Sequence, residues 1–156
     1  MLAHERRRIV HFNITDHPTG QWTAQQIVEA FPWETAPCYL LRDRDTIYGV
    51  AFQQRVSHMG IKEVKITLRS PWQNPYAERV IGSIRRDALD HVVVLHERHL
   101  HRVLRSYVDY YHHWRTHRSL EMDAPEPRAI QPLEMGRVKK IPEVGGLHHH
   151  YERIAA

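Results

Sequence analysis

The sequence predicts a mixed α/β fold, and three observations support this prediction. Short runs rich in β-branched, aliphatic and aromatic residues are separated by segments with helical periodicity. The predicted order is strand, helix, strand, helix, strand, helix, helix, followed by a proline-containing tail. The chain has 156 residues, of which 42% are hydrophobic and 26% charged, so it is long enough for one domain with a tail.

The first part of the chain predicts two strands around one helix. Residues 8–14, Arg-Ile-Val-His-Phe-Asn-Ile, form the first expected strand. A helix is expected over 23–30, with Thr23 as its N-cap. After a loop over 31–37, the run Cys-Tyr-Leu-Leu-Arg at 38–42 predicts a short buried strand.

The next segment predicts a helix and a strand. The helix covers about 50–59, and Gly60 fits its C-terminal cap. Residues 62–67 form the following strand. The single cysteine, Cys38, excludes an intramolecular disulfide, which favours a reducing cytosol. We expect it to be a small buried residue without a catalytic role.

Two amphipathic helices follow. The first begins after Pro71 and places its apolar residues within one arc, with Glu78 beside that arc. These apolar residues are Ala77, Val80, Ile81, Ile84 and Ala88. The second helix has apolar positions from Leu100 to Trp114 at helical spacing, and we expect its aromatic stripe to lie in the core.

The tail over 121–156 contains several prolines, which prevent a long helix. Residues 138–144 and 147–153, on either side of Gly145-Gly146, predict a small hairpin. His148, His149 and His150 are expected at its surface. The histidines His96, His99 and His101 do not predict zinc, because no cysteine accompanies them.

The charge balance favours an anionic partner. The formal net charge is +4 with an isoelectric point near 9.4, and arginine outnumbers lysine 18 to 4. Arginine binds phosphate in a bidentate manner, so nucleic acid is a natural partner, although a solvated basic surface explains the same composition. No apolar run is long enough to cross a membrane. No glycine-rich phosphate loop is present either.

The strongest chemical signal is a pair of carboxylates. Asp43 ends the strand 38–42, and Glu78 lies on the later helix, with 34 residues between them. Two carboxylates placed in this way can hold divalent metals for phosphodiester chemistry. Periodicity puts Asn74 and Arg85 on the helix stripe of Glu78, and Arg79 and Arg86 on the next stripe. The simpler interpretation is a solvated helix edge on which Glu78 is salt-bridged to arginine.

Three motifs, in order, resemble the catalytic core of integrases and DDE-type transposases of insertion sequences, which has an RNase H-like fold. The run 41–48, Leu-Arg-Asp-Arg-Asp-Thr-Ile-Tyr, resembles the second-aspartate motif of that family. The run 70–79, Ser-Pro-Trp-Gln-Asn-Pro-Tyr-Ala-Glu-Arg, resembles its third-carboxylate motif. The run 110–120 resembles its closing segment, but carries His112 where asparagine is usual and Thr116 where proline is usual.

The resemblance implies metal-dependent DNA strand transfer. It implies two Mg²⁺ or Mn²⁺ ions, with Asp43 and Glu78 as catalytic and metal-binding residues and DNA as the partner. Asn74, Arg79, Arg85 and Arg86 are the expected DNA-binding residues. Asp45 is the alternative to Asp43, which we prefer for its distance from Tyr48 and its place nearer the strand end. Family members act as homo-oligomers, and a cytoplasmic, nucleoid-associated location without a membrane partner is expected.

The resemblance also predicts an incomplete core. We expect residues 1–120 to be a partial catalytic core that lacks the first strand, with its aspartate, and most of the second strand. Asp16, the only aspartate before Asp43, follows the strand 8–14 and does not substitute. The chain alone is therefore expected to be inactive, and strand 8–14 to lie unpaired or to pair elsewhere. The alternatives are a non-catalytic DNA-binding remnant or a pseudogene fragment.

Overall fold

The computed structural model describes residues 1–32 and 35–155, and its architecture is mixed α/β, as predicted. The chain forms two compact units. The first unit comprises Met1–Leu2 and Val10–Arg79, and the second comprises Ala3–Ile9 and Val80–Ala156. This division does not test the predicted boundary near residue 120, which stays a prediction.

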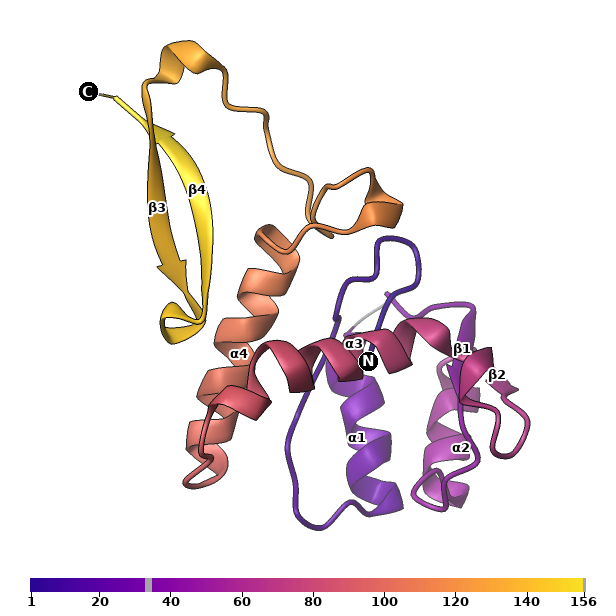
Figure 1. The fold of residues 1–156 in the computed structure, drawn as a ribbon. Coiled ribbons are helices and arrows are strands. Elements are labelled where there is room, and N and C mark those ends of the chain that lie inside the picture. The colour runs from indigo at the N-terminus through magenta and orange to yellow at the C-terminus, as the bar shows by residue number, and fades with distance from the viewer. Residues whose placement is uncertain (33–34, 156) are drawn as a thin grey trace. The chain divides into compact units, whose positions relative to one another are not determined.

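The first unit contains two helices and a two-stranded sheet (Figure 1). Strands β1 (Tyr39–Arg42) and β2 (Lys62–Lys65) are parallel, with Tyr39 opposite Lys62 and Arg42 opposite Lys65. Their connection contains helix α2 (Val50–His58), and helix α1 (Gly20–Ala30) precedes β1. Part of the predicted loop 31–37 lies outside the described residues. A short 3₁₀ helix, η1 (Pro71–Gln73), leads to helix α3 (Pro75–Asp87), whose first residues belong to this unit.

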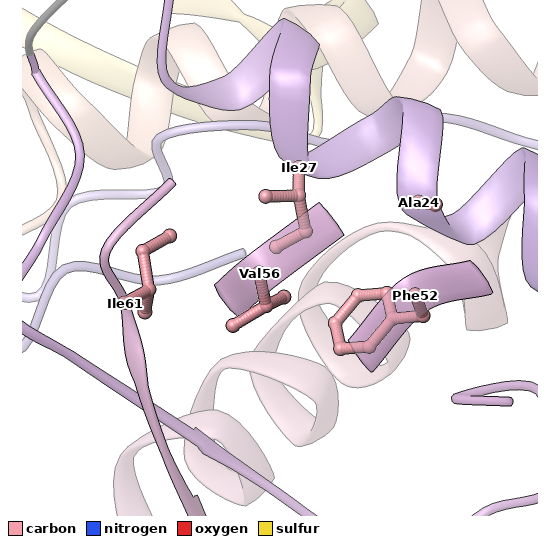
Figure 2. Packing of buried hydrophobic residues seen from close by; sticks show 5 residues of the cluster. All are labelled: Ala24, Ile27, Phe52, Val56 and Ile61. Carbon is pink, nitrogen blue, oxygen red and sulfur yellow. The ribbon is translucent and has the colours of Figure 1, made fainter. Parts of the chain in front are cut away.

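The core of the first unit forms between α1 and α2. Figure 2 shows five buried side chains that meet there, namely Ala24, Ile27, Phe52, Val56 and Ile61. Phe52 and Val56 are one turn apart on α2, and Ala24 and Ile27 are one turn apart on α1, so each helix contributes one apolar stripe. Leu40 of β1 packs against this cluster, which fixes the strand to the helices.

Of the two predicted helix caps, the structure confirms one and contradicts the other. Gly60 has φ +71°, its N–H donates to the Ser57 carbonyl, and the Ile61 N–H donates to the Val56 carbonyl. This is a Schellman ending, which confirms the predicted cap. The N-cap of α1 is Thr19 rather than Thr23, because Thr19 accepts a hydrogen bond from the Trp22 N–H. Thr23 lies inside the helix and is buried.

Residues 8–14 do not form the predicted strand. The N–H groups of Ala3 and Val10 donate to the carbonyls of Arg8 and Met1, and only this short contact is strand-like. A strand needs a partner along its length, and the described residues provide none beyond it. His11 and Asn13 instead bind the buried Gln26 side chain of α1, at 2.8 and 2.9 Å.

Cys38 is exposed, so the predicted burial is wrong. It precedes the first paired residue of β1, and its carbonyl accepts a hydrogen bond from the Lys62 N–H. The strand itself is half-buried, because the two-stranded sheet covers only part of it.

The second unit contains most of α3, the long helix α4 (Glu97–His113) and a hairpin of strands β3 (Arg137–Glu143) and β4 (His148–Ile154) (Figure 1). The hairpin is antiparallel, as predicted. Tyr107 and Tyr111 of α4 are fully buried, which confirms the core role of part of the aromatic stripe. In the part of the chain that the structure describes, no helix is long and apolar enough to cross a membrane.

Two burial predictions for the second unit are wrong. Ile81 of α3 is 60% exposed, whereas Ser83 is buried. The inward face of α3 is rotated toward Ser83 and Asp87, because both bind polar groups from α4 and the segment after it. His150 of the hairpin is buried rather than exposed, because its ring stacks on Trp114.

Candidate functional site

Asp43 lies directly after β1, in a turn that side chains hold in place. Its Oδ1 accepts a hydrogen bond from the Asp45 N–H at 3.2 Å, and its carbonyl accepts one from the Arg42 guanidinium at 2.9 Å. Arg42 is buried and is itself fixed by Glu63 of β2, with Nε 2.6 Å from Oε2. The Asp43 side chain is exposed, so its second carboxylate oxygen is open to a ligand.

The neighbouring Asp45 has a different role in this turn. Its Oδ1 accepts hydrogen bonds from the Ile47 N–H at 3.0 Å and the Thr46 hydroxyl at 3.5 Å. Asp45 therefore stabilises the turn that leads toward Tyr48. Burial raises the pKa of Tyr48, and the negative charge of Asp43 raises it further.

A chain of contacts links the Asp43 turn to the start of α3. The Arg44 Nε donates to the Ile66 carbonyl at 3.0 Å, just after β2. Next in the chain, the Thr67 N–H donates to the Gln73 side chain at 2.7 Å. Since the two strands are parallel, their carboxyl ends meet at one edge of the sheet. The segment that positions α3 therefore begins at the edge where Asp43 lies.

Glu78 lies in the first turn of α3, and its side chain is exposed. Its N–H donates to the Asn74 carbonyl at 3.2 Å, so Asn74 stands immediately before the helix. Among the described residues, the Glu78 carboxylate has no hydrogen-bond or ion-pair partner. The alternative interpretation of a salt bridge between Glu78 and arginine is therefore not observed.

The structure places Asp43, Asn74, Glu78 and Arg79 in the first compact unit. Within the described residues, no group of three acidic, histidine or cysteine side chains is arranged to hold a metal ion. The pairing of Asp43 with Glu78 at one metal site therefore stays a prediction.

The arginines of α3 are exposed. Arg85 lies 3.5 Å from Asp90, but its side chain remains 76% exposed. The Arg86 side chain folds back over Gly82. A Cβ atom placed on Gly82 would lie 2.9 Å from the Arg86 Nη1. Arg79 and Arg86 are seven residues apart, so they lie on one side of the helix.

A second polar cluster, which sequence reasoning missed, joins the end of α3 to the closing segment. The Asp87 Oδ2 accepts hydrogen bonds from the Tyr107 hydroxyl and the Arg115 Nε, both at 3.0 Å. Arg115 also donates to the Ser83 hydroxyl at 3.2 Å. Burial raises the pKa of Tyr107. Arg115 belongs to one of the three quoted motifs, and this membership was the available signal for its role.

Two of the three histidines in the closing segment, His112 and His117, make contacts inside the second unit. His112, at the position where asparagine is usual, accepts a hydrogen bond from the Ile9 N–H at 2.9 Å. Burial lowers the pKa of His112. His117 is buried edge-on against Tyr111, and its Nε2 has no hydrogen-bond partner. Burial lowers the pKa of His117 to about 4, and the charges of nearby arginines lower it in the same direction.

A pocket of about 480 Å³ lies in the second unit and contains neither Asp43 nor Glu78. Its lining includes Trp114, Arg128 and His150. The pocket results from the packing of the hairpin against the end of α4, so it is not a candidate for the metal chemistry.

A comparison with protein families finds a match over part of the chain. Residues 59–125 match the model of the integrase core domain, which confirms the recognition of an integrase or transposase catalytic core. The matched segment covers less than half of the chain and includes Glu78 and the closing segment, but not Asp43. A comparison with curated proteins found no match.

Proposed function

We propose that this chain supplies two metal-binding carboxylates, Asp43 and Glu78, to a site for DNA strand transfer. The observation that carries the proposal is a series of hydrogen bonds at the carboxyl ends of β1 and β2. One of these hydrogen bonds links the Asp43 turn to Ile66. The next links Thr67 to Gln73, which lies just before the helix that carries Glu78. The match to the integrase core domain supports the same reaction class.

The donor set fits a hard divalent cation. Mg²⁺ and Mn²⁺ prefer oxygen ligands and retain several waters, so two exposed carboxylates with open coordination positions suit them. When bound, such ions lower the pKa of an attacking hydroxyl and stabilise the leaving oxygen of a phosphodiester. Asp45 is the weaker candidate ligand, because one of its oxygens accepts two hydrogen bonds in the turn.

The other residues of the site position these ligands and the DNA. Arg42, held by Glu63, fixes the backbone of the Asp43 turn. The exposed Arg79, Arg85 and Arg86 offer cations along α3 for the phosphate backbone, and Asn74 stands at the start of that helix. Phosphate contacts of this kind orient DNA without reading its sequence.

The finer fold proposal is an RNase H-like core. The parallel pair β1–β2, joined through α2, and the carboxylates after β1 and on α3 support it. The aspartate that the family resemblance places on the first strand is not identified in this chain. We therefore expect the 156-residue chain alone to give no strand transfer with Mn²⁺ and the cognate element ends.

A second candidate function is DNA binding without catalysis. The exposed arginines of α3 favour it, because Arg79, Arg85 and Arg86 offer cations to a phosphate backbone. The two functions differ in their response to metal, because phosphate contacts by arginine need no divalent ion, whereas strand transfer does.

Calorimetric titration with Mn²⁺ tests the proposal. We expect weak binding by the unmodified chain and loss of that binding in Asp43→Asn and in Glu78→Gln. Glu97→Gln is the matched control, because Glu97 is also an exposed carboxylate in the first turn of a helix. Binding that survives both site substitutions, or that is lost equally in the control, would refute the two-ligand proposal.

A further inference from the structure

The pocket of the second unit has more hydrogen-bond donors than acceptors among its side chains. Its volume is about 480 Å³, and it is lined by the ends of α3 and α4, by residues that follow α4 and by β4. Its charged side chains are Arg115, Arg128 and Asp87. The three consecutive histidines of β4 line it as well. Among the described residues, the lining therefore contains two guanidinium groups and one carboxylate.

The carboxylate of the pocket is neutralised within the protein. The Asp87 Oδ2 accepts hydrogen bonds from the Tyr107 hydroxyl and the Arg115 Nε, both at 3.0 Å. Arg115 also donates to the Ser83 hydroxyl at 3.2 Å, and these two contacts leave further N–H donors on its guanidinium. Because Arg115 balances the charge of Asp87, the positive charge of Arg128 is left over in the pocket.

Arg128 and two hydroxyl groups are the donors that the pocket offers to a ligand. The Arg128 side chain is exposed, and its Cζ lies 5.4 Å from the centroid of the Trp114 ring. The hydroxyl-bearing side chains of Thr116 and Tyr110 also line the pocket. In the part of the chain that the structure describes, none of these three donor side chains is bound to an acceptor. Burial raises the pKa of Tyr110, so its hydroxyl stays protonated at neutral pH.

Ring stacking fixes the walls of the pocket. The His150 ring stacks on Trp114 with a centroid distance of 3.7 Å, and the His148 ring stacks on Tyr110 at 4.5 Å. Two other carboxylates lie next to His150 without lining the pocket, namely Glu143 and Glu152. Because the walls are held by these contacts, the pocket does not need to order itself before it binds a ligand.

A phosphate monoester matches this set of donors. Near neutral pH it carries about two negative charges and presents three acceptor oxygens in different directions. Arginine binds phosphate through two parallel N–H groups, and hydroxyl donors can reach the remaining oxygens. A carboxylate has only two oxygens in one plane, so it satisfies fewer of the donors. Small-molecule pockets measure about 300–1,000 Å³, so this volume admits an organic group as well as the phosphate.

We propose that this pocket binds a small phosphate monoester, with Arg128, Thr116 and Tyr110 as donors to its phosphate oxygens. Arg115, which lines the same pocket, supplies further N–H groups. The inference does not depend on the proposed metal site, because neither carboxylate of that site lines the pocket.

The phosphorylated end of a DNA strand carries the same chemical group as a free monoester. We assign the pocket to the free molecule, because Arg128 is the charged donor of the lining that has no carboxylate partner. A duplex is instead held by several cations that follow its backbone.

Equilibrium dialysis of the full chain against radiolabelled glycerol phosphate, in chelator and at about pH 7.5, tests the proposal. We expect a dissociation constant below about 1 mM. Unlabelled inorganic phosphate should displace the label, whereas acetate should compete at least about tenfold more weakly, since it offers fewer acceptor oxygens.

Substitutions in the lining identify the donors. Arg128→Gln should weaken binding by roughly 10–100-fold, the range for one hydrogen bond to a charged group. Arg128→Lys keeps the charge without the planar fork and should recover part of this loss. Thr116→Val should weaken binding by about fivefold. Arg118→Gln is the matched control, because Arg118 is an exposed arginine of the same unit outside the pocket, and it should keep the affinity within about twofold.

Circular dichroism of each variant establishes that the fold is retained. No retained glycerol phosphate, or equal weakening in Arg128→Gln and Arg118→Gln, would overturn the proposal. Competition by acetate as strong as that by inorganic phosphate would show a general anion surface and would also overturn it. Displacement of the label by a duplex with phosphorylated ends, at an equal concentration of phosphate monoester groups, would assign the pocket to DNA and overturn the proposal as well.

Discussion

Acidification should destabilise the second unit through His117. The pKa of this buried histidine is lowered from 6.5 to about 4, chiefly by burial. Because the folded-state pKa is depressed, the unfolded chain binds the proton first as the pH falls. The contribution to stability is complete above the unfolded pKa of 6.5 and is lost as the pH falls toward 4.

The magnitude follows from the two pKa values. A difference of one pKa unit corresponds to about 1.4 kcal/mol, so His117 alone accounts for a loss of up to about 3 kcal/mol. The lowered pKa of His112 acts in the same direction. In the folded protein, protonation would place a charge beside Tyr111 and near Arg115, where the Nε2 of His117 has no hydrogen-bond partner.

Urea unfolding followed by circular dichroism, from about pH 7 to about pH 4.5, measures this loss. His117→Phe should retain the aromatic contact with Tyr111 and remove most of the pH dependence, whatever its effect on stability at neutral pH. His99→Phe, at a half-buried position on α4, is the control and should keep the dependence. Equal pH dependence in the unmodified chain and in His117→Phe would refute the reasoning.

Three further substitutions test the packing. Arg115→Gln should lower the free energy of unfolding by about 1–3 kcal/mol in urea titrations, because Asp87 loses a charged donor. An effect no larger than that of Arg118→Gln would contradict this prediction. Gly60→Ala should lower the free energy of unfolding by about 1 kcal/mol in thermal unfolding, because φ is +71°. No atom lies within 4 Å of the new Cβ, so the cost comes from the backbone conformation alone. A neutral result would exclude the left-handed cap. Gly136→Ala should cost more than Gly60→Ala, because its Cβ would overlap the Ile154 carbonyl oxygen, and hydrogen exchange in β3 and β4 should increase.

The order of the elements was predictable because it depends on local patterns. Helical periodicity located α4, and the glycines at 60 and 145–146 located a helix end and a hairpin turn. The N-cap of α1 was not decided by pattern, because Thr19 and Thr23 both precede apolar residues, and only the hydrogen bond to Trp22 distinguishes them.

The contacts that join distant segments were not predictable. Arg115 binds Asp87 across 28 positions of sequence, and the rotation of α3 that buries Ser83 and exposes Ile81 accompanies this contact. His150 looks like a surface residue in the sequence, and its burial depends on Trp114 being placed beside it. The strand expected over 8–14 did not form, because strand propensity alone does not provide a pairing partner.

Iron-directed cleavage of the backbone tests most directly whether Asp43 and Glu78 share a metal ion. With Fe²⁺ in place of Mg²⁺, ascorbate and peroxide generate radicals that cut the chain next to the bound ion. We predict two groups of cuts, one around residues 43–45 and one around 74–79, and both should disappear together in Asp43→Asn and in Glu78→Gln. Cuts at only one of these segments, or cuts at one that persist when the other carboxylate is removed, would contradict a shared site.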